Sequence, residues 1–357
     1  MKKLDLTGNE RFLVVRTDRI GDLVLSTPVP EAIKSRYPES RITMMVSSYA
    51  ADVIKGNPNL DEVMVDDSGN KNRGIKGFFV LLRETRRRKF AVAILLKPTM
   101  RLAVLLFLAG VKHRIGTGFR FYQILFNQKV YMHRKVNLKH EVEYNLDMLR
   151  PLGIIPQRII PIIYVDPQGE EFVHEIFNEF KITPEDTVVA IHPGSGNSSL
   201  NLPAKRFAEV ADGLADKMNA KIVFTGSDKE KNLIDIIKKK MKYESFNLAG
   251  RTSIPQLVAV LQRCDVLISG STGPMHLAAA LGTPTVAIFS PVFSAGPIRW
   301  GPYGEGHQVI LPPVPVCFEC KSKSCPHYDC MEKIKPNQII SKVELVLKEK
   351  SKLKNIK

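Results

Sequence analysis

The sequence is poor in cysteine and in long apolar segments, and each shortage excludes a class of protein. Five cysteines in 357 residues, four of them between Cys317 and Cys330, cannot form the disulfide framework of a secreted protein. The longest apolar run, residues 102–111, is too short to cross a bilayer, and the first residues hold no apolar segment of a secretory signal. We therefore expect a cytoplasmic protein that touches a membrane only peripherally, at its inner face.

Acidic residues are scarce as well, and from residue 85 to residue 140 there are none. The chain carries 52 Lys and Arg against 36 Asp and Glu, a net charge of +16, which predicts an anionic partner such as nucleic acid, a membrane surface or a phosphorylated substrate. No nucleic-acid-binding motif accompanies the charge, so we expect no nucleic acid. Arg120, in an aromatic and basic loop, is the best candidate to bind an anionic acceptor.

Short apolar runs alternate with helical patterns along the chain, in two series that begin near residues 12 and 188. This alternation predicts an α/β fold with parallel, doubly wound sheets. A proline-rich linker around residues 151–167 separates the two series. We expect domains at residues 1–165 and 166–335, with a ligand cleft between them at the carboxyl ends of the strands. We also expect one helix over residues 23–37 and a basic C-terminal helix, residues 336–357, that packs back on the first domain.

The sequence is organised around a turn in the second half. A predicted strand at residues 266–268 is followed by a Gly/Ser/Thr turn and then by a helix that ends near Gly282. Such a turn directs backbone N–H groups and the positive end of the helix at a bound phosphate. Ser271, Thr272, Gly273 and His276 are the candidate phosphate-binding residues. The alternative is an ordinary strand-to-helix turn with a surface histidine.

Two further turns contain candidate residues. The first strand runs into Arg16-Thr-Asp-Arg-Ile-Gly-Asp22, and a carboxylate at the start of the following helix can act as a general base. The alternative for Asp22 is an acidic residue that only stabilises the helix dipole. After the first strand of the second half, His-Pro-Gly-Ser195-Gly forms another candidate phosphate cradle.

The segment Ser-Thr-Gly-Pro-Met-His-Leu-Ala-Ala-Ala-Leu-Gly at residues 271–282, together with Gly21-Asp22, resembles the ADP-heptose:lipopolysaccharide heptosyltransferases, glycosyltransferase family 9. The resemblance implies a GT-B fold, with two Rossmann-like domains facing across a cleft. It implies an inverting, metal-independent transfer of heptose from ADP-heptose, without a cofactor, to an anionic lipopolysaccharide-core acceptor. By this resemblance Asp22 is the catalytic base, Lys205 meets the donor phosphates and Glu230 holds the ribose, with Asp228 as the rival to Glu230. We further expect Arg16 to contact the acceptor, and the protein to be a monomer.

Ser271 departs from the family, many members of which carry Asp at this point of the turn. Two alternatives therefore stay open: a transferase of the same fold that uses a different nucleotide sugar, and a non-catalytic basic protein that binds glycolipid or nucleic acid. Binding measurements with different nucleotide sugars separate the first of these from the main prediction.

Four cysteines, Cys317, Cys320, Cys325 and Cys330, lie in a C-x₂-C-x₄-C-x₄-C pattern. They are either reduced or partly paired structural thiols, or the ligands of a structural metal. We expect no catalytic metal.

Overall fold

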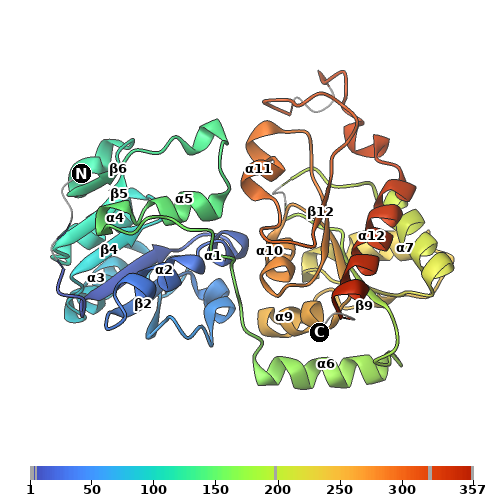
Figure 1. The fold of residues 1–357 in the computed structure, drawn as a ribbon, viewed down its shortest axis with the longest axis horizontal. Helices are drawn as coiled ribbons and strands as arrows, with labels where there is room; N and C mark the ends of the chain where they lie inside the picture. Colours follow the sequence, from blue (N-terminus) through green and yellow to red (C-terminus); the bar gives the residue numbers. More distant parts are fainter. Residues whose placement is uncertain (1–3, 5, 197–198, 321–323, 355–357) are drawn as a thin grey trace. The chain divides into compact units, whose positions relative to one another are not determined.

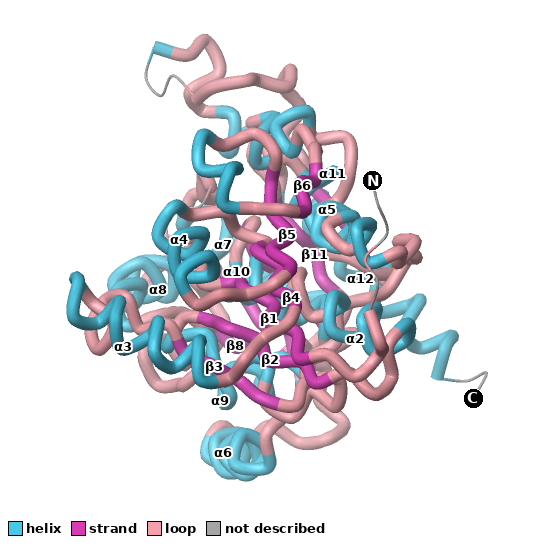
Figure 2. The backbone as a smooth tube through the Cα atoms, turned by 90° about the vertical axis from the view of Figure 1, so that its left-hand side faces the viewer, coloured by secondary structure: helices cyan, strands magenta, loops and turns pink. Residues whose placement is uncertain are grey.

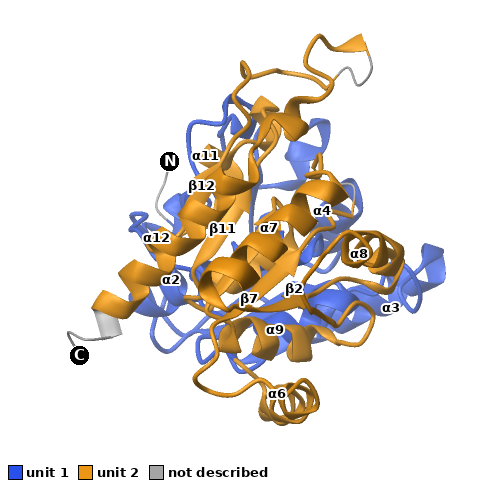
Figure 3. Cartoon of the chain, turned by 90° about the vertical axis from the view of Figure 1, so that its right-hand side faces the viewer, with its two compact units in different colours: residues 1–164 blue, residues 165–357 orange. Residues whose placement is uncertain are grey.

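The computed structural model describes residues 4, 6–196, 199–320 and 324–354, and divides the chain into two compact units, Met1–Tyr164 and Val165–Lys357. Each unit is built on its own six-stranded sheet (Figure 1). The units are shown in separate colours in Figure 3. No helix among the described residues is both long enough and apolar enough to cross a membrane.

Six strands and five α-helices lie in the described part of the first unit. The strands are β1 (Arg11–Arg16), β2 (Arg41–Val46), β3 (Glu62–Val65), β4 (Val92–Leu95), β5 (His113–Thr117) and β6 (Gln128–Val130). The helices are α1 (Ile20–Val24), α2 (Pro28–Arg36), α3 (Gly74–Arg87), α4 (Met100–Leu108) and α5 (Glu141–Asp147), with short 3₁₀ helices η1 (Ser48–Ile54), η2 (Phe121–Leu125), η3 (Arg134–Val136) and η4 (Arg150–Leu152).

The strands of the first sheet are all parallel, in the order β3-β2-β1-β4-β5-β6. Alternate residues of β1 point to opposite faces, so Leu13 and Val15 belong to a core with helices α3 and α4, which lie side by side (Figure 2). On the other face Phe12 packs against the tilted ring of Tyr37, at the end of α2, and α2 contacts α5. The sheet is therefore covered on both faces, as a parallel sheet requires.

The second unit repeats this plan. Its strands are β7 (Val188–His192), β8 (Lys221–Phe224), β9 (Phe246–Asn247), β10 (Val266–Gly270), β11 (Thr285–Ile288) and β12 (Gln308–Ile310). Its helices are α6 (Pro167–Glu179), α7 (Ala204–Met218), α8 (Lys231–Lys238), α9 (Ile254–Arg263), α10 (Gly273–Ala280), α11 (Pro297–Trp300) and α12 (Pro336–Lys354), with 3₁₀ helices η5 (Asp228–Glu230), η6 (Phe293–Ala295) and η8 (Cys330–Lys333).

The second sheet is also parallel throughout, in the order β12-β11-β10-β7-β8-β9. Numbered from the start of each unit, both sheets have the strand order 3-2-1-4-5-6 of the Rossmann fold. The predicted fold class, α/β with two Rossmann-like doubly wound domains, is confirmed.

The C-terminal helix differs from its predicted location. Helix α12 lies beside α7 (Figure 3), and its residues Ile339, Ile340, Val343 and Val346 are buried in the core of the second unit. The sequence analysis placed this helix on the first domain. Its apolar stripe instead covers the sheet that contains β10 and β11, because that face needs a second helix beside α7. The predicted last residues of the helix, 355–357, are outside the described part of the chain.

The helix predicted over residues 23–37 is in fact two helices. Helix α1 ends at Val24 and α2 begins at Pro28, which occupies the first helical position. Proline there has no backbone N–H to donate to the preceding turn, so the helix cannot run on through it. The break leaves Asp22 on a short helix directly after β1.

Candidate functional site

In the first unit, the strand order reverses between β1 and β4, and this is the point at which doubly wound sheets bind ligands. The turn after β1 carries Arg16, Asp18 and Asp22, and the residues after β4 include Lys97. The ammonium of Lys97 lies 3.8 Å from a carboxylate oxygen of Asp18. The predicted turn therefore lies at the reversal point of its sheet, together with a lysine that the sequence analysis did not select.

Arg16 is the centre of this group. Its side chain is only 3% exposed, and its Nε donates to Asp18 at 2.7 Å. One of its terminal nitrogens donates to Oδ1 of Asp22. The other approaches Oε1 of Glu141 at 3.3 Å and Oδ1 of Asn145 at 3.2 Å. A planar guanidinium with five N–H donors suits such a set of oxygens.

Helix α5 supplies the second half of this network. Glu141 is fully buried and also accepts a hydrogen bond from Arg134. The side-chain amide nitrogen of Asn145 donates to the backbone oxygen of Leu25 at 3.0 Å. Asn145 thereby connects α5 to the chain that follows Asp22. The contact between Arg16 and Glu141 joins residues 125 positions apart, and no local sequence signal indicated it.

The surroundings of Asp22 raise the pKa of its carboxyl group. Burial is the largest cause, and the neighbouring carboxylates of Asp18 and Glu141 add to it, while Arg16 acts in the opposite direction. Burial alone would lower the pKa of Arg16, but the three carboxylates outweigh it and raise that pKa. Arg16 thus stays charged, and Asp22 holds a proton more readily than an exposed aspartate.

The two residues expected to bind the acceptor are located differently. Arg16 is enclosed by its carboxylate and amide partners, so it does not occupy the surface position that a contact with the acceptor needs. Arg120 is exposed and precedes η2. Among the described residues, no hydrogen bond or ion pair connects Arg120 with the Asp22 group. The structure therefore does not bring these two arginines together.

In the second unit, the reversal point lies between β7 and β10. The turn after β10 leads into α10, with Thr272 as its N-terminal cap and Gly273 as its first residue. The hydroxyls of Ser269 and Thr272 are 3.0 Å apart, and both side chains are buried. Ser271 and Gly273 are partly exposed. The start of α10 can therefore direct its N–H groups at an anion.

His276 lies in the first turn of α10 and is buried. The alternative of a surface histidine is wrong. The prediction that His276 helps to bind the donor phosphates stays a prediction.

The turn after β7 lies beside the turn after β10, because the two strands pair with His192 opposite Ser269. The hydroxyl of Ser195 donates to the backbone oxygen of Ser199 at 2.9 Å. The hydroxyl of Ser199 in turn lies 3.7 Å from the position a Cβ would take on Gly270. The two predicted phosphate cradles thus belong to one edge of one sheet.

Glu230, after β8, is directed at the same edge. A Cβ on Gly194 would lie only 1.7 Å from Oε1 of Glu230, so only glycine allows this approach. The other oxygen of Glu230 accepts from the backbone N–H and the hydroxyl of Ser227, each at 2.7 Å, and lies 3.9 Å from Nε2 of His192. Burial lowers the pKa of His192, and Glu230 opposes this in part.

Asp228, the rival to Glu230, points outward. Its side chain is 80% exposed and pairs with Lys231 at 2.5 Å, whereas the side chain of Glu230 is 16% exposed. The hydrogen bond from Lys231 lowers the pKa of Asp228. The geometry therefore favours Glu230 as the carboxylate of this edge.

Lys205, another predicted donor-binding residue, is not held at the turns after β7 and β10 by any residue that the structure describes. Its side chain is 75% exposed, and its ammonium lies 4.0 Å from Glu209 on the same helix. Lys205 also lines a hollow of about 810 Å³ with Asp212, Asp216 and Tyr243. Within the described residues, no hydrogen bond or ion pair holds Lys205 to the turns after β7 and β10.

All five cysteines are free thiols. Burial is the first cause that raises the pKa of Cys317 and of Cys330, and the neighbouring thiols raise both further. In residues 4, 6–196, 199–320 and 324–354, no group of three or more His, Cys, Asp or Glu side chains is arranged to hold a metal ion. Both alternatives for the four clustered cysteines, structural thiols and the ligands of a structural metal, stay predictions.

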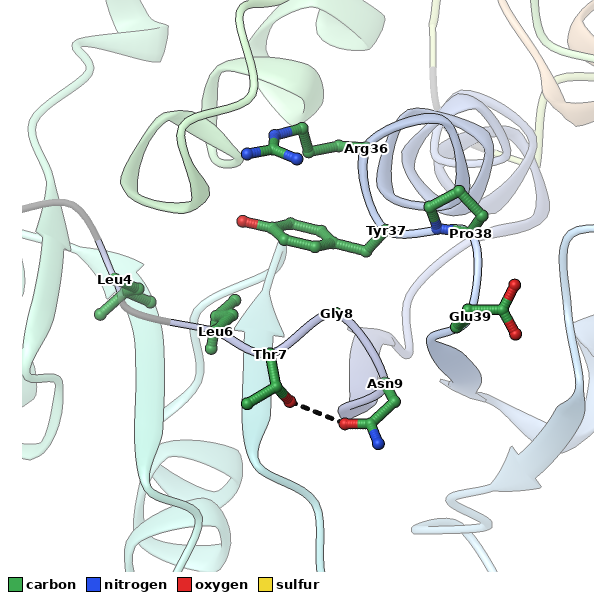
Figure 4. A pocket seen from close by; sticks show the side chains of 9 residues that line it. All are labelled: Leu4, Leu6, Thr7, Gly8, Asn9, Arg36, Tyr37, Pro38 and Glu39. Atoms are coloured by element: carbon green, nitrogen blue, oxygen red, sulfur yellow. Dashed lines mark hydrogen bonds between the residues drawn. The ribbon is translucent and has the colours of Figure 1, made fainter.

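A second hollow, of about 690 Å³, lies elsewhere on the first unit (Figure 4). Its lining comes from the segment before β1, including Thr7 and Asn9, and from the end of α2, including Arg36 and Tyr37. These segments lead into β1 and β2, so the hollow lies at the amino ends of the strands. It is therefore separate from Asp22, which lies at their carboxyl ends.

Comparison with known proteins shows which family the chain resembles. The sequence model of glycosyltransferase family 9 (heptosyltransferase) matches residues 78–330. Lipopolysaccharide heptosyltransferase 2 of Escherichia coli K12 is 25% identical over 296 residues, which cover 79% of this chain and 83% of that protein.

Solved structures of this family have the same fold, and this confirms the GT-B class that the sequence predicted. The crystal structure of a family 9 glycosyl transferase from Veillonella parvula superimposes with a TM-score of 0.89 at 25% identity, and the match covers 98% of this chain and all of that one. The structure of E. coli ADP-heptose LPS heptosyltransferase II has a TM-score of 0.77 at 22% identity, with 96% and 99% of the two chains covered, and shows the same fold.

Proposed function

The chain belongs to glycosyltransferase family 9 and is a glycosyltransferase, and we propose that it moves a heptose from ADP-heptose to the core of a lipopolysaccharide with inversion at the anomeric carbon. One observation carries the mechanistic part of the proposal. Asp22 stands at the carboxyl end of β1 with a raised pKa and is held by the buried Arg16. A fixed carboxylate at the reversal point of a doubly wound sheet is well suited to act as a general base.

In the proposed reaction, Asp22 takes the proton from the acceptor hydroxyl as its oxygen attacks the anomeric carbon. The bond between that carbon and the diphosphate oxygen breaks, and the diphosphate leaves with the bonding electrons. Attack from the face opposite the leaving group inverts the anomeric carbon. The proton remains on Asp22 until it passes to water.

We assign donor binding to the edge of the second sheet. The N–H groups at the start of α10 and the hydroxyl of Thr272 would stabilise the charge that develops on the diphosphate. Ser195, Ser271 and Gly273 belong to the same edge, and Lys205 would reach the phosphates by its long, exposed side chain. We assign the ribose hydroxyls to Glu230, because a carboxylate accepts from them and this one is directed at the same edge.

The acceptor is the least specified substrate. The E. coli relative is named a lipopolysaccharide heptosyltransferase, and a phosphorylated, acidic acceptor agrees with the net charge of +16. We assign Arg120 to this acceptor. The proposal places the protein in the cytoplasm, as a monomer at the inner face of the membrane in which a lipid-anchored acceptor would lie.

A donor screen tests the proposal. Thermal unfolding is measured with ADP-heptose, ADP-glucose, UDP-glucose and GDP-mannose, and transfer to a purified lipopolysaccharide core is then measured with each donor that stabilises the protein. We expect ADP-heptose alone to be both bound and transferred. Transfer from a UDP- or GDP-sugar would instead support the alternative that Ser271 raises, a transferase of the same fold with a different donor.

A further inference from the structure

The outer surface of one helical layer of the first unit is unusually apolar. Helices α3 and α4 and the short helix η2 cover the sheet face on which Leu13 and Val15 lie (Figure 2). On the outside of this layer, Ile75 is 78% exposed, and Phe121 and Ile124 are each 79% exposed. Single exposed apolar residues are ordinary, but several large ones on one layer mark an interaction surface.

Helix α3 shows the pattern most clearly. Its inner side buries Gly77, Leu81 and Thr85 against the sheet. Its outer side presents Phe79 and Val80, both about half exposed, one turn after Ile75. The helix therefore carries large apolar side chains on both sides, although among the described residues only its inner side packs within the unit.

Cations surround these apolar residues. On α3, the solvent-facing positions between and beyond them are occupied by Lys76, Arg83, Arg86 and Arg87. The only acidic residue between Asp67 and Glu141 is Glu84, and it pairs with Arg88 at 3.1 Å. The outer surface of the layer therefore combines exposed apolar side chains with positive charge that is almost uncompensated.

Side-chain contacts near the start of α4 connect this helix to the loop before α3. Arg101, on α4, pairs with Asp66 at 2.6 Å and donates to the backbone oxygen of Asn72 at 3.2 Å, in the loop before α3. The starts of α3 and α4 follow β3 and β4, so they lie at the carboxyl ends of the strands, as does Asp22. A partner bound along this layer would lie at the same end of the first unit as the proposed base.

We propose that the outer face of α3, α4 and η2 docks on an anionic lipid bilayer. Amphipathic helices that lie in the bilayer interface combine apolar residues, which enter the lipid, with Lys and Arg, which contact the anionic headgroups. The charge complementarity selects the bilayer, and a lipid-anchored acceptor, which belongs to the proposed function, gives the docking its purpose.

Vesicle sedimentation tests the proposal on the full-length protein. Binding is measured with vesicles of phosphatidylcholine alone and of phosphatidylcholine with 30% phosphatidylglycerol, without donor or acceptor. We expect binding to the anionic vesicles only, with an affinity that falls as salt is raised. The variant R83Q/R86Q/R87Q should bind roughly 100-fold more weakly, about fivefold for each charge removed. The variant I75S/F79S should lose at least about tenfold.

A matched control lies on α8 of the second unit and in the turn directly after it, where Ile236, Lys239 and Lys240 are also exposed. The variant I236S/K239Q/K240Q should bind vesicles as the wild type does. All variants should keep the wild-type Tm and the wild-type turnover with a delipidated, soluble acceptor, so that loss of docking is distinguished from failure of the proposed function.

Three results would overturn the docking proposal. One is equal binding of the α3 variants and the wild type, and another is an equal loss in the α8 control. The third is a wild-type protein that binds neither kind of vesicle. This result would assign the face to an acidic protein partner. If no heptose is transferred while vesicle binding depends on α3, the proposed function fails and the docking surface stands.

Discussion

The guanidinium of Arg16 and the carboxylate of Asp22 form a hydrogen-bonded ion pair at the carboxyl end of β1. Arg16 also binds Asp18 and Glu141, and Arg134 adds a second cation at Glu141. Three carboxylates are thus arranged around one buried arginine. The position of Asp22, and its affinity for a proton, depend on residues that no substrate needs to touch.

Replacing Arg16 by lysine should separate these carboxylates. A lysine keeps the charge but cannot hold Asp18, Asp22 and Glu141 with one planar group. We expect R16K to lower kcat roughly tenfold to hundredfold by misplacing Asp22, and to lower the free energy of unfolding by about 2 kcal/mol. Steady-state kinetics and urea unfolding measure the two effects. The exposed Arg19 of the same turn is the control, and an equal fall in kcat for R19K would contradict the assignment.

The pH dependence of kcat/KM should report the raised pKa of Asp22. A general base must be deprotonated, so activity should fall on the acid side, at a pH above the ordinary pKa of an aspartate. Glu141 is one of the carboxylates that raise this pKa, so E141Q should lower the pKa of Asp22 and move the acid limb to lower pH. The neighbouring E143Q, on the same helix, should leave the limb in place. An acid limb that does not move in E141Q would show that Asp22 is not the titrating base.

Glu230 and Asp228 differ only slightly in sequence position but strongly in exposure. We expect E230Q to raise the KM for the donor roughly tenfold, because a charged acceptor of ribose hydrogen bonds is lost. D228N should leave the KM unchanged, since its side chain is turned to solvent. Initial rates over a series of donor concentrations distinguish the two. The reverse order of effects would assign the ribose to Asp228.

Arg120 should affect only the acceptor. We expect R120A to raise the KM for the lipopolysaccharide core several-fold and to leave the donor KM unchanged, because the positive charge would meet an acidic acceptor. The exposed Lys135 provides a control for the general loss of one charge from the same acid-free segment. Equal changes in the two KM values of R120A would exclude a specific contact with the acceptor.

The sequence predicted the alternating architecture because apolar periodicity is a local signal. The turns that carry Asp22, Ser195 and Thr272 follow strands as expected. The three-residue strand β6 was missed, because it is too short to show a period. The short strand β12 was missed for the same reason.

The network around Asp22 was beyond what the sequence could show. Glu141 and Arg16 are 125 residues apart. The packing of α5 against α2 and the hydrogen bond from Asn145 to Leu25 bring α5 close to the turn after β1. The role of Gly194 was hidden for a related reason. Its missing Cβ leaves room for Glu230, a residue of another strand end, and a single sequence does not show such a contact.

The central claim is that Asp22 takes the proton from the attacking hydroxyl. The direct measurement is the rate of heptose transfer from ADP-heptose by D22N, an isosteric change that removes the base and keeps the shape, together with the donor dissociation constant. The account predicts a fall in kcat of roughly 10²–10⁴-fold with donor affinity unchanged. Wild-type turnover by a folded D22N protein would contradict it.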